Sequence, residues 1–351
     1  MTASDLLLRP AVENAATRRQ FLALMAAGGL LTACGDDDED AGPGAAPTPS
    51  SRQVPSDNGP VTVPSDPKRV VAAIGSFETD MVAVGITPVL TTNFAGPWVD
   101  LGPDTTITEN VPPTPEELVL AEPDLIVGWN WVTKEPGFDR IAAVAPYVGL
   151  GETEATAGAG WDFKVPMKSW DTLFLSVCEA VGRRDRGLEL VQELEAKIDA
   201  LARRRADAGD ISVARLEFRE PGTFTWRGQN EDTAELMRRI GLEVVGPDES
   251  EQDVSVERLP EVDADWLVIP VGGSGTPQEV FDEVANSEIF QRVPAVQAGR
   301  VLTVDGALWP GLGYLWAVAM VEDLERLFGD GDPAATASAS PSPEADGASV
   351  S

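Results

Sequence analysis

The stretch that organises this chain reads DRGLELVQELEAKIDALARRR and spans residues 185–205. Its aliphatic residues recur at spacings of three and four, the pattern of a helix packed along one face. They are Leu188, Val191, Leu194, Ile198 and Leu201. Asp185 can cap the start of this helix, and the arginines 203–205 complement the macrodipole at its end. About 21 residues of helix span roughly 30 Å, which is the diameter of a small domain.

Strand-like and helix-like runs alternate on both sides of this helix. This order predicts an α/β fold of two lobes, each with a central β-sheet flanked by helices, joined by a single long helix over residues 182–208. The lobes are expected at residues 61–181 and 209–329. A helix inside one large sheet is the alternative that periodicity leaves open.

Apolar runs bounded by turn residues predict four strands in each lobe. They are Lys68–Ile74, Ile86–Leu90, Asp124–Val127, Tyr147–Leu150, Ile211–Phe218, Glu243–Val245, Asp265–Pro270 and Arg300–Val304. The helices expected with them are Phe77–Val84, Glu116–Ala121, Ile141–Ala145, Trp170–Val181, Asp232–Ile240, a short one from Ser255, Pro277–Ala285 and Gly311–Phe328.

Length and composition set outer bounds on function. The chain has 351 residues, 43% of them hydrophobic, which is enough to bury two cores. Its formal net charge of -32 would repel phosphate backbones and anionic lipid surfaces, so we expect no nucleic-acid partner.

The N-terminal residues 1–34 have the features of an export signal. An Arg18-Arg19 pair precedes the apolar run Phe21–Ala33, which is too short to span a bilayer, and the run ends at Cys34. This combination resembles a bacterial twin-arginine lipoprotein signal, in which Cys34 would be lipidated and become the mature N-terminus. A cleaved signal without lipid is the alternative. Residues 35–60 are expected to be a disordered tether, and residues 330–351 a disordered tail.

Residue types that are missing exclude several chemistries. The chain has no histidine, which removes His-based triads, His zinc sites and His-ligated haem. No acid and base pair and no phosphate loop is recognisable, so we expect no enzyme, no cofactor and no metal site of the protein's own. Cys178 is the one cysteine besides Cys34, so the mature chain cannot form an internal disulfide, and we expect Cys178 to be buried as a small apolar side chain.

Tryptophans and arginines at the ends of predicted strands suggest a binding site. The carboxyl ends of strands in open α/β sheets face the ligand crevice, and indoles offer broad apolar contact with one donor each. The candidate ligand-binding residues are Trp129, Trp226, Arg227, Trp309, Arg219 and Trp98. Trp131, Trp161 and Arg140 are further candidates near the crevice, and any one of the indoles could instead be a packed core residue.

Short phrases in both lobes resemble a known family. They are Pro67–Val71, Asp80–Ile86, Pro115–Leu118, Pro123–Ile126, Val254–Glu257, Ala295–Val301 and Val304–Trp309. In order and spacing, over residues 60–329, the chain is similar to the substrate-binding lipoproteins of ABC importers for ferric siderophores, haem and cobalamin. The resemblance implies two lobes on a rigid central helix, a ligand in the cleft between them, and Trp226 and Trp309 among its contacts.

The same resemblance implies the protein's partners and location. In the family, one glutamate on each lobe docks into arginine pockets of the membrane permease, and Glu116 and Glu257 occupy the matching positions. The implied partners are the permease, its ATPase and a ferric siderophore, for a monomer held by lipid on the extracytoplasmic face of the cell membrane. Either acid taken alone is also explained by its place in the first turn of a helix.

The ligand itself stays open. A ferric trihydroxamate, neutral or cationic, would suit tryptophans with one or two arginines, whereas a triply anionic ferric catecholate would need a dense cationic basin. We therefore favour a ferric hydroxamate. Haem bound through Tyr314 or Tyr147, cobalamin, a sensor or scaffold that does not transport, and a surface hydrolase are the alternatives.

Overall fold

The structure is a computed structural model that describes residues 7–8, 50–74, 77–92, 99, 101–151, 169–207, 209–229, 232–248, 251–273, 275–307, 309 and 313–329. Cys34, Trp98, Trp161 and the predicted tail lie outside these residues. The chain divides into two compact units. The N unit comprises Arg9–Gln192 and Pro310–Ala317, and the C unit comprises Met1–Leu8, Glu193–Trp309 and Val318–Ser351. The mixed α/β architecture is the one that the sequence predicts.

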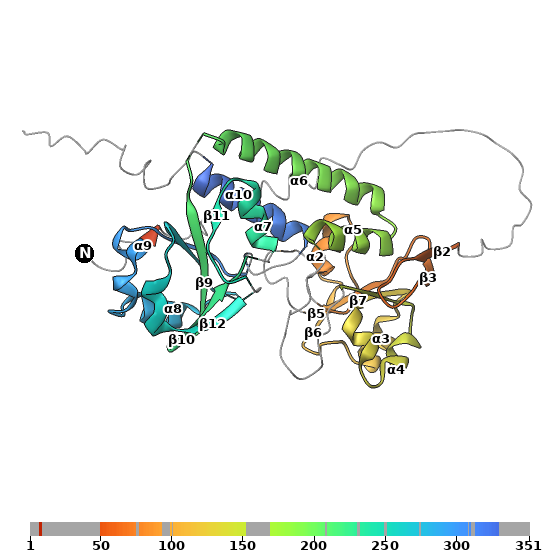
Figure 1. The fold of residues 1–351 in the computed structure, drawn as a ribbon. Coiled ribbons are helices and arrows are strands. Elements are labelled where there is room, and N and C mark those ends of the chain that lie inside the picture. Colours follow the sequence, from red (N-terminus) through yellow and green to blue (C-terminus); the bar gives the residue numbers. More distant parts are fainter. Residues whose placement is uncertain are drawn as a thin grey trace, which may run out of the picture. The chain divides into compact units, whose positions relative to one another are not determined.

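The N unit is built on a five-stranded parallel sheet (Figure 1). Its strands, in spatial order, are β6 (Thr106–Thr108), β5 (Leu90–Thr92), β4 (Val70–Ala72), β7 (Leu125–Trp129) and β8 (Tyr147–Leu150). All residues of β4, β5, β7 and β8 are buried, as expected of a parallel sheet covered on both faces. The sequence predicted four of these strands and missed β6, a three-residue edge strand with one buried side chain.

The helices of the N unit are α2 (Phe77–Ala83), α3 (Pro115–Ala121), η4 (Asn130–Lys134), α4 (Phe138–Ala142) and α5 (Trp170–Ala180). In α3, Thr114 and Glu117 form a reciprocal capping box, and Pro115 occupies the first turn. The helix predicted at 141–145 begins three residues earlier, because the left-handed Gly137 starts it at Phe138.

A β-hairpin replaces the last part of the predicted tether. β2 (Ser51–Val54) pairs antiparallel with β3 (Val61–Pro64). Val54 is 1% exposed, and the Arg52 guanidinium donates to the Ala180 carbonyl oxygen at 2.8 Å, which fastens the hairpin to the end of α5. The tether hypothesis for residues 51–60 is therefore wrong. The polar composition of the segment gives no sign of the hairpin, because the contact that anchors it lies about 128 residues away in sequence.

The organising helix is α6 (Arg184–Arg205), close to its predicted bounds. Its buried face consists of Gly187, Leu190, Leu194, Ile198, Leu201 and Arg205. Leu188 was assigned to this face but is 36% exposed. It lies two positions, or about 200° of helical rotation, from the buried Leu190.

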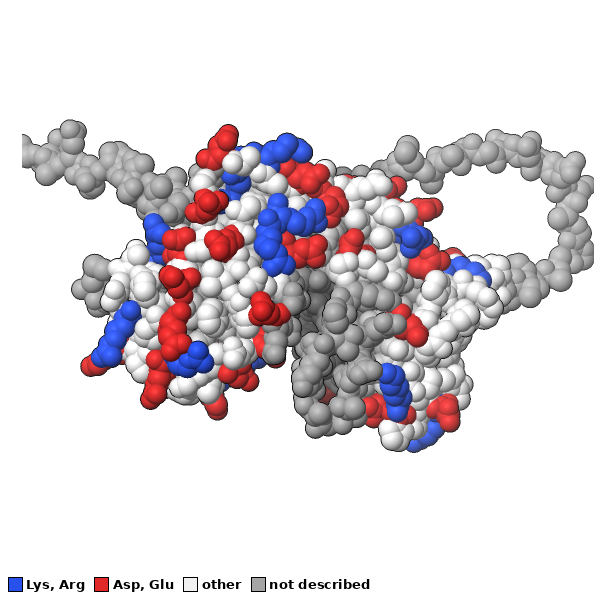
Figure 2. Space-filling model, in the orientation of Figure 1, with Lys and Arg blue, Asp and Glu red and all other residues white. Residues whose placement is uncertain are grey.

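Acidic and basic side chains lie side by side on the face of the protein drawn in Figure 2.

The C unit is built on a seven-stranded mixed sheet in the order β1-β14-β13-β9-β10-β12, with β11 paired to β9. The strands are β1 (Leu7–Leu8), β14 (Val301–Asp305), β13 (Trp266–Val271), β9 (Ser212–Glu220), β10 (Thr223–Arg227), β12 (Glu251–Ser255) and β11 (Glu243–Val244). β10 pairs antiparallel with both β9 and β12, while β9, β13 and β14 run parallel. β1 belongs to the predicted signal segment. Cleavage of that segment would remove β1 and leave β14 at the edge of the sheet. The sequence prediction missed β1, β10 and β12.

The helices of the C unit are α7 (Asp232–Arg239), η5 (Val256–Glu261), α8 (Gln278–Ala285), η6 (Phe290–Arg292), α9 (Pro294–Gln297) and α10 (Tyr314–Phe328). The division between the units falls within α6, after Gln192, and within α10, after Ala317. Among the described residues, no helix is both long enough and apolar enough to cross a membrane.

Candidate functional site

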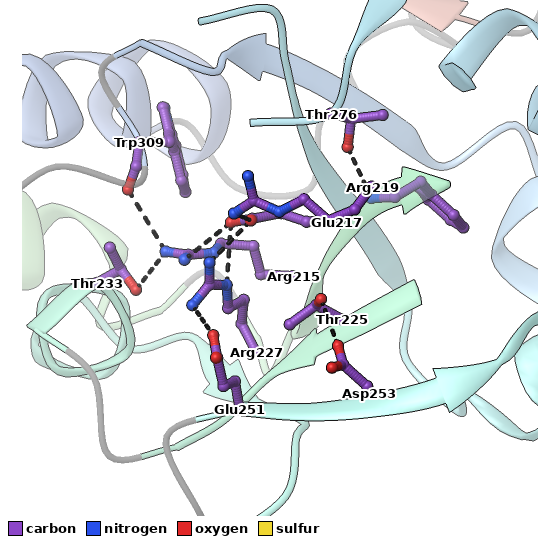
Figure 3. A network of polar contacts seen from close by, with 11 residues as sticks. Arg215, Glu217, Arg219, Thr225, Arg227, Thr233, Glu251, Asp253, Thr276 and Trp309 are labelled. Atoms are coloured by element: carbon purple, nitrogen blue, oxygen red, sulfur yellow. Dashed lines mark hydrogen bonds and ion pairs between the residues drawn. The ribbon is translucent and has the colours of Figure 1, made fainter. Parts of the chain in front are cut away.

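A buried carboxylate on β9 gathers three arginines (Figure 3). Glu217 is 0% exposed. Its Oε1 accepts hydrogen bonds from Arg227 Nε at 3.0 Å and from Arg215 Nη2 at 3.3 Å. Its Oε2 accepts from Arg227 Nη2 at 2.8 Å and from Arg219 Nη2 at 3.0 Å. We call these four residues the Glu217 cluster.

The cluster follows from strand alternation. Arg215, Glu217 and Arg219 stand at spacings of two on β9, so their side chains share one face of the sheet. Thr225 lies opposite Glu217 on β10, which places Arg227 on that face as well. The intervening residues Ala214, Leu216, Phe218 and Phe224 point the other way and belong to the hydrophobic core of the C unit.

β12 adds acidic neighbours along the outer edge of the cluster. Glu251 lies opposite Arg227 in the β10–β12 register and forms an ion pair with the Arg227 Nη1. Asp253, opposite Thr225, accepts a hydrogen bond from the Thr225 hydroxyl at 2.7 Å. Figure 3 shows both acids on β12 below the arginines.

The three arginines differ in exposure and therefore in role. The side chain of Arg215 is 5% exposed, that of Arg227 13% and that of Arg219 54%. Arg215 also donates to Thr233 Oγ1 at 2.7 Å and to the Trp309 carbonyl oxygen at 3.4 Å, so it joins β9 to α7 and to the turn after β14. Arg219 is the arginine most accessible to a solute.

Glu217 keeps its charge in spite of its burial. Burial alone would raise the pKa of Glu217, but the charges of Arg215, Arg227 and Arg219 and the hydrogen bond from Arg227 outweigh it, so the pKa is lowered. A buried charge with several charge-assisted hydrogen bonds is held in one geometry. The cluster therefore holds its guanidiniums in fixed positions on one face of the sheet.

The predicted indole contacts are placed differently from the arginines. Trp226 neighbours Arg227 on β10, but successive strand residues point to opposite faces, and its indole packs on the core while Nε1 donates to the Val245 carbonyl at 3.0 Å. Trp309 is 0% exposed, and its Nε1 donates to Asp323 Oδ2 at 2.9 Å. The structure thus brings Arg219 and Arg227 together and leaves these two indoles outside the cluster.

Trp129 is a core residue of the N unit. It is 3% exposed, and its ring lies 5.0 Å from that of Phe77. The backbone of Gly151 packs on the indole so closely that a Cβ there would lie 2.1 Å from Trp129 Cζ3. Its role as a ligand contact stays a prediction, as do those of Trp226 and Trp309. Trp131 is half-buried.

The two candidate docking acids are on the surface. Glu116 lies in the first turn of α3 and forms an ion pair of 2.7 Å with Arg140, with side chains 72% and 66% exposed. Arg140 was expected near the ligand; the structure places it on Glu116 instead. Glu257 is exposed in the first turn of η5, where Ser255 caps the turn.

The two tyrosines considered as haem ligands are buried. Tyr147 is 4% exposed, its hydroxyl donates to the Trp129 carbonyl at 3.0 Å, and burial raises its pKa, which disfavours the phenolate that binds iron. Tyr314 is 8% exposed and stacks on Phe174 at 4.7 Å. The described residues include no group of three or more Cys, Asp or Glu side chains that could hold a metal ion.

Sequence reasoning missed Arg215 and Glu217, the centre of the cluster. A signal was present, since R-x-E-x-R at residues 215–219 alternates charges with the apolar Leu216 and Phe218. This alternation is typical of a strand with one polar face. The prediction instead took the run 211–218 as an apolar strand and looked for function only beyond its end.

Known proteins share the sequence pattern and the fold. The family described as Periplasmic binding protein matches residues 82–308. The Fe(3+)-citrate-binding protein YfmC of Bacillus subtilis (strain 168) is 24% identical over 290 residues, covering 80% of this chain and 86% of YfmC. The iron(3+)-hydroxamate-binding protein YxeB of the same organism is 23% identical over 265 residues, covering 72% of this chain and 78% of YxeB. The crystal structure of Staphylococcus aureus SirA complexed with staphyloferrin B has a TM-score of 0.62 at 19% identity, covering 78% of this chain and 97% of SirA.

Proposed function

The chain belongs to the periplasmic binding protein family, and from this premise we propose that it is the substrate-binding component of an ABC importer that captures an iron–siderophore complex. The observation that carries the proposal is the Glu217 cluster, where guanidiniums on one sheet face are held ready for the oxygens of a chelate. The names of two relatives, which refer to ferric citrate and ferric hydroxamate, support iron chelates as the ligand class.

In this proposal the protein binds a complete chelate and performs no chemistry on it. The siderophore fills the coordination sphere of the iron, so no side chain of the protein needs to ligate the metal. Arg219 and Arg227 would contact the outer oxygens of the chelate through charge-assisted hydrogen bonds. Trp129, Trp226 and Trp309 are proposed as secondary contacts on the sequence argument alone.

Two ligand charge classes are candidates. The sequence favours a ferric trihydroxamate, which is neutral or cationic. The specific observation in favour of an anionic ferric chelate is the pair of guanidiniums, Arg219 and Arg227, on one carboxylate. Haem bound through tyrosine is the weaker alternative, given the burial of Tyr147 and Tyr314.

Delivery and anchoring complete the proposal. We propose that Glu116 and Glu257 dock the loaded protein on a membrane permease served by an ATPase. We further propose that Cys34 carries the lipid that holds the protein on the extracytoplasmic face of the membrane.

Tryptophan fluorescence tests the ligand class directly, because the chain has nine tryptophans and coloured ferric chelates quench nearby indoles. The protein is titrated with a ferric trihydroxamate, a ferric tricatecholate, a ferric citrate-type chelate, haemin and cobalamin, and with the iron-free chelators as controls. We expect saturable quenching by a ferric chelate at submicromolar concentration. Saturation by haemin or cobalamin alone would overturn the siderophore assignment, and no saturable response to any of them would favour a protein that does not transport.

A further inference from the structure

We propose that Glu217 is a positioning residue: its carboxylate holds Arg219 and Arg227 as a paired set of donors, and the site thereby selects anionic iron chelates over neutral or cationic ones. This inference rests on the function proposed above and concerns how that site discriminates. The ligand oxygens it implies are carboxylates or catecholates, which share a negative charge.

The carboxylate fixes the orientation of both guanidiniums. Arg227 binds it through Nε at 3.0 Å and Nη2 at 2.8 Å, a two-point contact that sets the plane of the group, while its Nη1 pairs with Glu251. Arg219 binds the same Oε2 through Nη2 at 3.0 Å. Arginine side chains have many rotamers in solution, so a partner that fixes them lowers the entropy lost when a ligand binds.

Glu217 also makes it possible for the arginines to lie close together. Like charges that meet at one point repel, and the repulsion is stronger away from bulk water. The carboxylate oxygens lie between the guanidiniums and offset that repulsion. Arg215 shares the carboxylate and is tied to Thr233 and Trp309, so the base of the arrangement is fixed on three elements.

Exposure separates the residue that positions from the residues that bind. Glu217 is 0% exposed, whereas the Arg219 side chain is 54% exposed. A solute therefore meets Arg219 before it could meet the carboxylate, and Glu217 acts through the arginines. Guanidiniums recognise charged planar oxygens in two-point geometry, which favours carboxylate and catecholate oxygens over the less charged surface of a neutral chelate.

The decisive variant is Glu217→Gln, because the two explanations of this residue predict opposite results. If Glu217 affected binding only through its charge, its removal would strengthen the binding of an anion. If it positions the arginines, Glu217→Gln weakens the anionic chelate. We expect a loss of about tenfold or more in affinity for an anionic ferric chelate, equivalent to about 1.4 kcal/mol, and less than about threefold for a neutral trihydroxamate.

A second set of variants decides the matter if Glu217→Gln does not fold, as judged by circular dichroism. Arg219 is the exposed arginine of the Glu217 cluster. Arg219→Lys keeps its positive charge but removes the planar guanidinium that the Glu217 carboxylate orients. Arg292→Lys is the matched control, since Arg292 is an exposed arginine paired with a surface acid, Glu288, outside the site. Positioning predicts that Arg219→Lys loses most of the preference for the anionic chelate and that Arg292→Lys keeps it.

The measurement is the ratio of dissociation constants for an anionic and a neutral ferric chelate, at two salt concentrations, for the wild type and each variant. A ferric tricatecholate and a ferric citrate-type chelate separate the two sources of negative oxygens. A merely structural role of Glu217 would weaken all chelates alike and leave the ratio unchanged.

Three results would overturn the inference while leaving the importer function intact. The first is tighter binding of the neutral or cationic trihydroxamate by the wild type. The second is unchanged or strengthened anion binding in folded Glu217→Gln, and the third is an unchanged ratio in Arg219→Lys. If no ferric chelate of any charge binds, the proposed function itself fails.

Discussion

The carboxylate of Asp80 accepts a hydrogen bond from the backbone amide of Tyr314 at 2.8 Å, across 234 positions of sequence. Asp80 lies on α2 and Tyr314 is the first residue of α10, and both belong to the N unit. An acceptor at this point satisfies one of the orphan amides at the start of a 15-residue helix. A Cβ on Gly313 would lie 2.5 Å from Asp80 Oδ1, so the backbone approaches the acid closely.

The first prediction concerns the protonation of Asp80. It is 0% exposed, and burial raises its pKa well above the usual range, with the hydrogen bond from Tyr314 opposing and the charge of Glu78 adding to the rise. When the pKa of an acid is higher in the folded state than in the unfolded state, the folded protein loses stability as pH rises. The loss begins near the unfolded pKa, about 3.9, and ends near the folded pKa. Asp80→Asn keeps the acceptor without the charge and should raise the melting temperature at pH 7 but not at pH 3.

Asp80→Ala is the matched control for that prediction. It leaves the Tyr314 amide without its acceptor and should cost about 1–3 kcal/mol at pH 3. The cost should be smaller at pH 7, because Ala also removes the carboxyl whose ionisation burial opposes. A lower melting temperature for Asp80→Asn at pH 7 would show that the ionised carboxylate is required.

The second prediction concerns the capping box of α3. Glu117 accepts hydrogen bonds from Thr108 Oγ1 at 2.6 Å, from the Thr114 amide at 2.7 Å and from Asn110 Nδ2 at 3.0 Å. These bonds, that from Thr108 first, lower its pKa to about 2. Because the pKa of Glu117 is lower in the folded state, its ionised carboxylate stabilises the folded protein. This stabilisation is complete above the unfolded pKa, here 4.5, and is lost as pH falls toward 2.

Glu117→Gln should therefore destabilise the protein by about 1 kcal/mol at pH 7, with the difference shrinking as pH falls from 4.5 toward 2. Thermal melts at several pH values measure it. Glu116→Gln is the control, because the neighbouring Glu116 is exposed and its ion pair with Arg140 contributes little. Equal effects of the two substitutions would contradict a specific role of the box.

The third prediction concerns Cys178. The thiol is 0% exposed, its pKa is raised by burial and then by the charge of Asp80, and the Gly187 backbone covers it so closely that a Cβ there would lie 2.6 Å from Sγ. In a Cys34→Ala background, Cys178 is the remaining thiol, and it should not react with thiol reagents until the protein is unfolded in denaturant. Gly187→Ala should speed the reaction, since the added methyl group forces α5 and α6 apart. Fast labelling of the folded protein without Gly187→Ala would contradict this burial.

The fourth prediction tests docking. Replacing Glu116 and Glu257 together with Ala should abolish uptake while changing ligand affinity by less than about threefold, since exposed surface charges contribute little. Glu189 and Glu288 form the matched control pair, because each is exposed and paired with an arginine as Glu116 is. Loss of ligand binding in the Glu116/Glu257 variant would place these acids in the binding site or the fold.

The fifth prediction tests anchoring. Cys34→Ala removes the thioether-forming side chain of the predicted signal, so the protein should move from the membrane fraction to the soluble fraction. Immunoblots of fractionated cells measure the distribution. A variant that remains with the membrane would contradict lipidation at Cys34.

Local patterns in the chain were sufficient for much of the architecture. The α6 helix, four parallel strands of each unit and the family itself were predicted, because amphipathic period, turn residues and short phrases are properties of neighbouring residues. The same local information was enough to select Arg219 and Arg227 as binding candidates.

The centre of the site depended on contacts that no local pattern contains. Glu217 meets Arg227 across ten positions because β9 and β10 pair in one particular register, and a shift of one residue would turn one of them toward the core. Trp129 and Trp309 are buried by tertiary packing. The Asp80 carboxylate is buried as well, and it accepts a hydrogen bond from the Tyr314 amide, which is far from it in sequence. Periodicity specifies which side chains share a face, whereas the partner that covers this face is chosen by packing between distant segments.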